Sequence, residues 1–257
     1  MNWWENEFLQ VKQNKLYLEN FSAEQLARKY GIPLYVYSLK KVAANYRHLK
    51  QAFEPAPTGI EVKIAYALKA NSHPGLLKML SKEGAAIDAV SPAEVDKAIQ
   101  AGFPEDRIMF TGTSISQEDF ERVLVHPGVT INIDAYEQVE LLQAARKRCQ
   151  IKKPVRVSVR WNPGLGRGFS SKTVTAGERS SDGTPIKFGV EDSRVIETFE
   201  KLRALKFLPI GLHQHLGSGW SEEDFPVAVK AVDRMIKKAR QLKMAGFNLE
   251  FLDFGGG

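Results

Sequence analysis

The sequence predicts an α/β fold in the form of a TIM-like (β/α) barrel, of which seven of the eight strand–helix units are present. From residue 62 onward, short apolar stretches alternate with stretches of helical period, a regularity typical of α/β proteins. The repeat averages about 28 residues, close to the roughly 31 residues per unit in a barrel of about 250 residues. The predicted strands are Val62–Lys69, Ala85–Val90, Arg107–Thr111, Val129–Asp134, Val155–Trp161, Leu208–Leu216 and Leu249–Phe254.

Helices are predicted between these strands. Apolar residues recur every three or four positions over 196–205 and 227–242. Ser91, Ser116 and Ser221 each stand three residues before a carboxylate, which is the pattern of a helix-capping box. The stretch Tyr136–Arg148 carries acids early and bases late, as the helix dipole favours.

Residues 1–61 do not follow the barrel repeat. The apolar run Leu34–Tyr37 predicts a short strand, which is free to belong to a different sheet. A helix is predicted over Leu39–Phe53, because the prolines of the following Glu54–Pro57 stretch end it.

The bulk composition excludes several classes of protein. The net charge of +6 arises from 36 Lys and Arg against 30 Asp and Glu, and the basic stretches also carry acids, so we expect no nucleic-acid partner. The single cysteine, Cys149, cannot form an internal disulfide and favours a reducing compartment. No signal peptide and no run of about 18 apolar residues is visible, so we predict a cytoplasmic protein without a membrane partner.

Lys69 is the first candidate for chemistry. It ends the first predicted strand, and the carboxyl ends of parallel strands carry the active sites of such sheets. Side chains alternate along a strand, so Lys69 is expected to share a face with Ala65 and Ala67, which leave room for a ligand.

His213 and His215 share a face at the end of the sixth predicted strand. Two histidines at this spacing can ligate a metal, but no third ligand is placed by the sequence, so we expect no metal site. The alternative is an imidazole lying flat against a planar cofactor. The turn Gly217–Gly219 that follows offers amides and the Ser218 hydroxyl to a phosphate.

Gly255, Gly256 and Gly257 end the seventh predicted strand, and they allow the backbone to approach a ligand closely. A barrel enzyme often holds a phosphate with the backbone that follows its late strands. A lysine, an imidazole and two phosphate-binding turns at the same end of a sheet fit pyridoxal 5′-phosphate.

The segment Gly164–Pro185 is long for a strand–helix loop, so we interpret it as a lid or a linker. Its glycine spacing resembles a dinucleotide loop, but no helix opens there.

Six segments carry a family resemblance: 66–71 (Tyr-Ala-Leu-Lys-Ala-Asn), 88–94 (Asp-Ala-Val-Ser-Pro-Ala-Glu), 160–164 (Arg-Trp-Asn-Pro-Gly), 187–189 (Lys-Phe-Gly), 213–218 (His-Gln-His-Leu-Gly-Ser) and 252–257 (Leu-Asp-Phe-Gly-Gly-Gly). On these segments the chain resembles the diaminopimelate decarboxylases, pyridoxal-phosphate enzymes with an alanine-racemase-like barrel. The resemblance covers nearly all of residues 30–257.

The resemblance implies roles for individual residues. Lys69 would bond to the cofactor's aldehyde and exchange it for the substrate amine, and His215 would stack on the ring. Lys69 and His215 are therefore the expected catalytic residues. The residues implied to contact the cofactor are Lys69, Asp88, Arg160, His215, Ser218, Gly255, Gly256 and Gly257.

The implied reaction is decarboxylation of meso-2,6-diaminopimelate to L-lysine and carbon dioxide. The alternatives are a sister decarboxylase acting on ornithine, arginine or carboxynorspermidine, a non-enzymatic pyridoxal-phosphate-binding protein, or a racemase. The substrate contacts that would separate the sister enzymes belong to the C-terminal half of the family's members.

Family members continue past the glycine turn into an eighth strand, a Glu-Pro-Gly-Arg motif and a C-terminal β-domain. We therefore expect a C-terminally truncated chain, in which residues 1–38 would pair with the missing β-domain and residues 39–257 form the truncated barrel. The resemblance implies a homodimer for the full-length protein, and an inactive or poorly soluble chain by itself.

Overall fold

The computed structural model describes residues 4–54, 59–179, 182–183 and 185–255. The chain packs as two compact units, one formed by Met1–Ile64 with His73–Ala85 and the other by Ala65–Ser72 with Ala86–Gly257. The predicted division after residue 38 concerns pairing with a further domain and stays a prediction.

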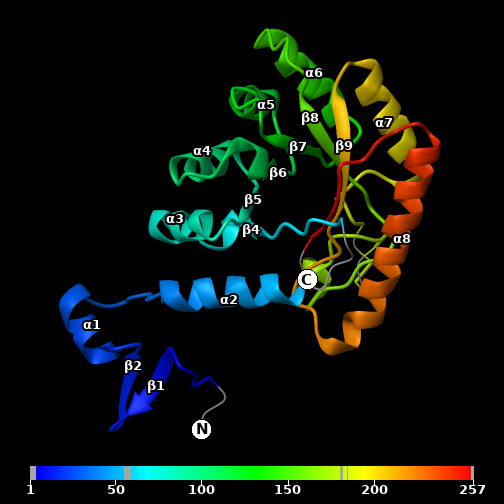
Figure 1. Cartoon of the computed structure of the whole chain (residues 1–257). Helices are drawn as coiled ribbons and strands as arrows, with labels where there is room; N and C mark the ends of the chain where they lie inside the picture. The colour runs from blue at the N-terminus through cyan, green and yellow to red at the C-terminus, as the bar shows by residue number, and fades with distance from the viewer. Residues whose placement is uncertain (1–3, 55–58, 180–181, 184, 256–257) are drawn as a thin grey trace. The chain divides into compact units, whose positions relative to one another are not determined.

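The second unit contains one sheet of seven parallel strands. Their spatial order, β10-β9-β8-β7-β6-β5-β4, follows the chain order, and the sheet curls into part of a barrel (Figure 1). The strands are β4 (Ala65–Ala67), β5 (Ala86–Ala89), β6 (Ile108–Phe110), β7 (Thr130–Ile133), β8 (Arg156–Arg160), β9 (Leu208–Gln214) and β10 (Phe251–Phe254). The predicted α/β barrel with seven strand units is confirmed.

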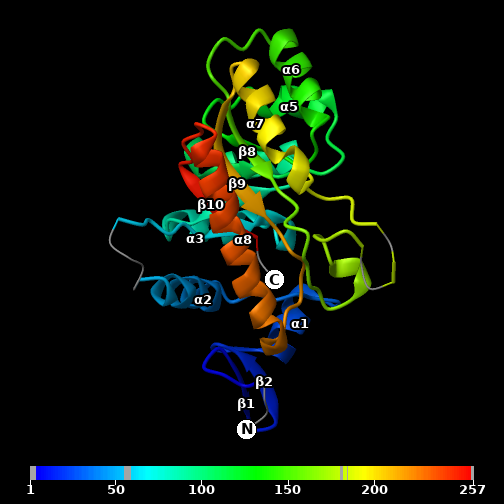
Figure 2. The same ribbon diagram turned by 90° about the vertical axis from the view of Figure 1, so that its right-hand side faces the viewer.

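Helices surround this sheet on its outer side (Figure 1), and Figure 2 shows α7 beside β8 and β9. They are α4 (Pro92–Gln100), α5 (Gln117–Val123), α6 (Gln138–Arg148), α7 (Val195–Ala204) and α8 (Phe225–Met244). The connecting segments contain short 3₁₀ turns: η1 (Leu68–Ala70), η2 (Glu105–Arg107), η3 (Ser171–Thr173), η4 (Asp192–Arg194) and η5 (Glu222–Asp224). The predicted caps are confirmed: the hydroxyls of Ser91 and Ser116 accept amide protons at the starts of α4 and α5, and Ser221 caps η5.

The two faces of the sheet differ in chemistry, and this difference positions the site. Apolar side chains pack toward the helices and are fully or almost fully buried, among them Ile87, Phe110, Ile131, Val159 and Leu212. Among the residues that alternate with them on the inner face, several carry polar groups. Register pairing aligns these polar positions across strands: Asn132 with Ser158, Arg160 with His213, and His213 with Asp253.

The first strand of the sheet is shorter than predicted. It ends at Ala67, and the chain then turns through η1, which contains Lys69. Leu68, the first residue of this turn, is fully buried. Ala65 and Ala67 pair with Ala86 and Asp88, so the expected inner face of small residues is confirmed, whereas Lys69 lies on the turn after it.

The first unit holds an antiparallel sheet that the sequence did not reveal, of β1 (Leu9–Lys12), β2 (Lys15–Leu18) and β3 (Phe21–Ser22). It also holds the helices α1 (Ala23–Tyr30), α2 (Leu39–Ala52) and α3 (Pro74–Lys82). The hairpin turns through Gln13 and Asn14, both at positive φ, without the glycine that usually marks such a turn.

The helix predicted over Leu39–Phe53 is confirmed by α2, but the strand predicted at Leu34–Tyr37 is wrong. These residues form no ladder and all four side chains are exposed, Tyr35 at 87%. Among the described residues, no helix combines the length and apolarity needed to cross a membrane.

Candidate active site

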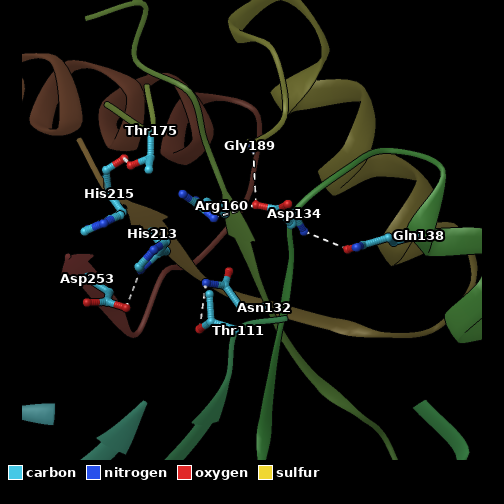
Figure 3. Close-up of polar contacts among 10 residues, drawn as sticks. All are labelled: Thr111, Asn132, Asp134, Gln138, Arg160, Thr175, Gly189, His213, His215 and Asp253. Atoms are coloured by element: carbon cyan, nitrogen blue, oxygen red, sulfur yellow. Dashed lines mark hydrogen bonds and ion pairs between the residues drawn. The ribbon is translucent and has the colours of Figure 1, made fainter. Parts of the chain in front are cut away.

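Asp134 and Arg160 form a buried ion pair on the inner face of the sheet (Figure 3). Arg160 Nη1 lies 2.9 Å from Asp134 Oδ1, and the amide of Gly189 donates to the same oxygen at 3.2 Å. The guanidinium also lies 4.9 Å from the ring centroid of Phe188. Burial raises the pKa of Asp134 and lowers the pKa of Arg160, and the two opposite charges oppose both shifts. Arg160 is thus held firmly at the inner face, with one nitrogen directed to Asp134.

His213 extends this polar row to the next two strands. It is the register partner of Arg160 on β8 and of Asp253 on β10. Its Nδ1 lies 2.5 Å from Asp253 Oδ2, and only 5% of the residue is exposed. Among the described residues, no group of three or more His, Cys, Asp or Glu side chains is placed to hold a metal ion. The partner of the His213 imidazole is thus the carboxylate of Asp253.

His215 lies two residues further along the same face, just past the end of β9. A Cβ atom built on Gly255 would lie 2.6 Å from His215 Nδ1, so the glycine backbone lies directly against the imidazole. Burial, Arg160, His213 and Lys69 lower the pKa of His215 to about 4. The ring is therefore neutral at physiological pH, which suits a flat contact with a planar, electron-poor ligand.

Asp88 faces the same interior from β5, where its register partner is Ala67. Burial raises the pKa of its carboxyl group, while a hydrogen bond from Thr111 and the charges of His213 and Lys69 oppose the rise. Its Oδ1 atom is buried and has no hydrogen-bond partner among the described residues. A buried carboxylate oxygen of this kind calls for a ligand, a proton or a water.

Lys69 is exposed, and its charge acts on both Asp88 and His215. The charge of the Lys69 amine thus lowers the pKa of both the Asp88 carboxyl group and the His215 imidazole. Lys69 and His215 were placed at strand ends by the sequence pattern and Asp88 by the family resemblance, and their assignment as one site stays a prediction.

The two predicted phosphate-binding turns stay a prediction, although two of their amides are bonded within the chain. The amide of Ser218 donates to the carbonyl of Thr173 at 3.1 Å, and the amide of Gly255 donates to the carbonyl of Gln214 at 2.7 Å. These two amides are therefore already engaged, and the exposed Ser218 offers its hydroxyl. Gly256 and Gly257 lie outside the described residues.

Asp134, Asp253 and Thr175 are site residues that sequence reasoning missed. Asp134 and Asp253 stand at inner-face positions near strand ends, a signal that was readable from the alternation of side chains. Thr175 gave no signal, because it reaches His215 from a loop 40 positions away in the sequence.

Comparisons with known proteins agree with this geometry. The family model for the pyridoxal-dependent decarboxylases, described as their pyridoxal binding domain, matches residues 39–257. The chain is 37% identical to the diaminopimelate decarboxylase of Methanothermobacter thermautotrophicus over 236 residues, which is 91% of this chain and 51% of that protein. It is 31% identical to the enzyme of the same name from Helicobacter pylori strain J99 over 241 residues, with coverages of 92% and 55%.

Solved structures show the same relationship. The H. pylori diaminopimelate decarboxylase complexed with L-lysine matches with a TM-score of 0.79 and 27% identity, over 90% of this chain and 55% of that one. The M. jannaschii enzyme in complex with L-lysine matches with a TM-score of 0.81 and 25% identity, over 98% and 57%. The chain spans about half the length of the curated relatives that it matches.

Proposed function

Because this chain belongs to the pyridoxal-dependent decarboxylase family, we propose that it forms the cofactor-binding part of an enzyme that decarboxylates meso-2,6-diaminopimelate to L-lysine and carbon dioxide. The observation that carries the proposal is that Asp88 and His215 lie on the inner face of the sheet, where the charge of Lys69, on the turn after β4, acts on both. The choice of substrate is supported by relatives named diaminopimelate decarboxylase at up to 37% identity.

The residues present fit pyridoxal phosphate. Lys69 supplies an amine for the aldehyde, the neutral imidazole of His215 supplies a flat surface, and the Ser218 hydroxyl supplies a donor for the phosphate. The buried Asp88 Oδ1 has no partner among the described residues and is available to a ligand or to a proton. When bound, pyridoxal phosphate supplies an electron-withdrawing ring that takes up the negative charge left as carbon dioxide departs.

Each of these side chains has a task in the proposed reaction. Lys69 Nζ is nucleophilic only after it loses a proton, and the carboxylate of Asp88, whose pKa is raised, is the nearby group suited to receive it. His215 covers one side of the site and keeps water from it. The Asp134–Arg160 pair fixes the polar row next to His213, because breaking a buried ion pair is costly.

We also propose that the complete protein is a cytoplasmic homodimer without nucleic-acid or membrane partners. Support comes from the free thiol of Cys149 and from the mixed distribution of 36 bases and 30 acids. Light scattering of the complete protein tests whether it is a homodimer, and fractionation of the producing cells tests whether it is cytoplasmic.

Cofactor binding is tested on the chain itself. We expect titration with pyridoxal phosphate to give the absorbance of a lysine-bound aldehyde, and sodium borohydride reduction to leave a stable mass adduct on Lys69. Lys69→Ala is expected to abolish the adduct. The control is Lys152→Ala, which removes an exposed lysine from the segment leading into β8, at the opposite end of the strands. An adduct that persists in Lys69→Ala would contradict the assignment.

Activity is tested on the complete reading frame of the gene. We expect carbon dioxide release from meso-2,6-diaminopimelate, loss of that release in Lys69→Ala, and little release from ornithine, arginine or carboxynorspermidine. Preferential release from one of those three amino acids would replace the proposed substrate. Cofactor binding without any release would instead favour a non-enzymatic carrier.

A further inference from the structure

A loop far away in the sequence is fastened to the turn that carries His215. We call residues 165–177 the strap and residues 215–219 the β9 turn. Four main-chain hydrogen bonds join them at 2.9 to 3.3 Å: Arg167 N to Leu216 O, Thr175 N to Leu216 O, Phe169 N to Ser218 O, and Ser218 N to Thr173 O. The strap includes η3 and is part of the yellow-green loop of Figure 2.

Side chains reinforce this attachment. Ala176 of the strap, Leu216 of the β9 turn and Ala231 of α8 form a small buried cluster, against which Leu165 and Trp220 pack. The indole of Trp220 donates to the carbonyl of Arg167 at 3.2 Å. The strap is thus held from two sides, by the β9 turn and by α8.

Gly217 shows how closely the two segments approach. A Cβ atom at this position would lie 1.8 Å from the carbonyl oxygen of Arg167, and the residue has φ +145°. No side chain is compatible with this contact, so the glycine is required by the strap. Its conformational freedom is used for packing within the chain.

The base of the strap is closed by Asn162. Its side-chain oxygen accepts the amide of Gly177 at 2.8 Å and the amide of Gly164 at 3.0 Å, and its side-chain nitrogen donates to the Gly177 carbonyl at 2.9 Å. Asn162, just after β8, is therefore bonded both to Gly177, the last residue of the strap, and to Gly164, which directly precedes the strap. These contacts fasten the strap at its base as well as along the β9 turn. The prediction that Gly164–Pro185 forms a lid or a linker stays a prediction.

Thr175 makes the contact that matters for the site. Its hydroxyl donates to the main-chain carbonyl of His215 at 3.0 Å (Figure 3). Its amide donates to the next carbonyl, that of Leu216, at 3.3 Å. Two successive peptide groups are thereby oriented by a single strap residue. Because Gly255 lies against the imidazole, His215 is restrained at its backbone and at its ring.

We propose that Thr175 is a positioning residue, which orients His215 through the hydrogen bond to its carbonyl while the other contacts of the strap hold the β9 turn. One consequence of this inference, tighter binding of the cofactor, rests on the proposed function. The orientation of His215 is a property of the chain without the cofactor and is measured separately.

The test uses three variants of the chain. Thr175→Val removes the hydroxyl and keeps the shape, and Thr175→Ser keeps the hydroxyl. The matched control is Thr173→Val, because among the described residues the Thr173 hydroxyl bonds within the strap, to Ser170, while its main-chain carbonyl accepts the amide of Ser218.

The first readout is made without cofactor, by NMR of the imidazole nitrogens of His215 and by amide hydrogen exchange of the β9 turn. In Thr175→Val we expect the ring to titrate about one pH unit higher, because a looser ring is better solvated, and the Ser218 amide to exchange roughly tenfold faster. Thr175→Ser and Thr173→Val should both match the unaltered chain in these two properties.

The second readout is pyridoxal-phosphate affinity, which we expect to fall about tenfold in Thr175→Val and to be retained in Thr175→Ser. If Thr175→Val leaves the His215 resonances and turn exchange unchanged, the proposal is overturned. A Thr175→Ser variant that behaves like Thr175→Val also overturns it, since packing of the methyl group would then be the cause. If the unaltered chain binds no pyridoxal phosphate, the proposed function fails, while the first readout still decides the role of Thr175.

Discussion

His213 and Asp253 are register partners on adjacent parallel strands, and the imidazole Nδ1 of one lies 2.5 Å from the carboxylate Oδ2 of the other. The pair closes a row of side chains that also contains Asp134 and Arg160 on the next strands. Acidic groups flank the row at both ends, with the basic groups between them. The inner face of the sheet is therefore held together by electrostatic contacts as well as by the main-chain ladder.

Asp253→Asn is expected to destabilise the chain by about 1–3 kcal/mol, because it removes the charged partner of a buried imidazole. The free energy of unfolding in urea measures the change. His213→Gln should cost a similar amount, and the double variant should cost less than the sum of the two single variants. Additive costs would show that the two side chains do not interact.

Asp134→Asn is expected to cost more, about 3–5 kcal/mol, since it leaves the guanidinium of Arg160 buried without a counter-charge. The carboxylate also accepts the amide of Gly189, so the segment after the strap should exchange amide protons faster. Asp96→Asn is the comparison, because Asp96 pairs with Arg122 at the surface and should contribute about 1 kcal/mol or less. Equal losses for the two substitutions would contradict a structural role for the buried pair.

Gly255→Ala is expected to displace the His215 ring, since the new methyl group would lie 2.6 Å from Nδ1 and 2.9 Å from the Gln214 carbonyl oxygen. Overpacking of this kind costs about 1–3 kcal/mol, and pyridoxal-phosphate affinity should fall with it. Calorimetry gives both values. Gly75→Ala serves as the control, because its nearest neighbour is the side chain of His73 at 3.3 Å. Unchanged His215 resonances in Gly255→Ala would contradict the predicted displacement of the ring.

Acidification is expected to destabilise the folded chain through His215. Its pKa falls from 6.5 to about 4 on folding, so the unfolded chain binds a proton in this interval while the folded chain does not. This contribution of His215 to the free energy of unfolding is present above pH 6.5 and is lost as the pH falls toward 4. The loss amounts to about 3 kcal/mol at most.

The raised pKa values of Asp88 and Asp134 act in the opposite direction, so the informative quantity is a difference. The free energy of unfolding of the unaltered chain should fall, relative to that of His215→Gln, between about pH 6.5 and pH 4. Parallel curves for the two proteins would show that His215 titrates normally.

The alternation of strands and helices could be predicted from the amino-acid pattern alone. Apolar runs such as Ala85–Val90 recur at a nearly constant interval, and the capping serines mark where helices begin, as the structure confirms. The pattern also placed Lys69 and His215 at the same end of their strands, since the direction of every strand in a parallel sheet is fixed by the chain, whereas Asp88 was implied only by the family resemblance. These are local properties, encoded by residues within a few positions of each other.

Contacts between distant residues depended on tertiary packing. Asp253 joins His213 across 40 positions, Gly189 joins Asp134 across 55, and the hydroxyl of Thr175 reaches His215 from the strap. In addition, β4 ends at Ala67 and Leu34–Tyr37 lies outside any ladder, against the local pattern. The physical reason is that hydrogen bonds and burial depend on which partner the folded chain supplies, and periodicity along the sequence carries no information about that partner.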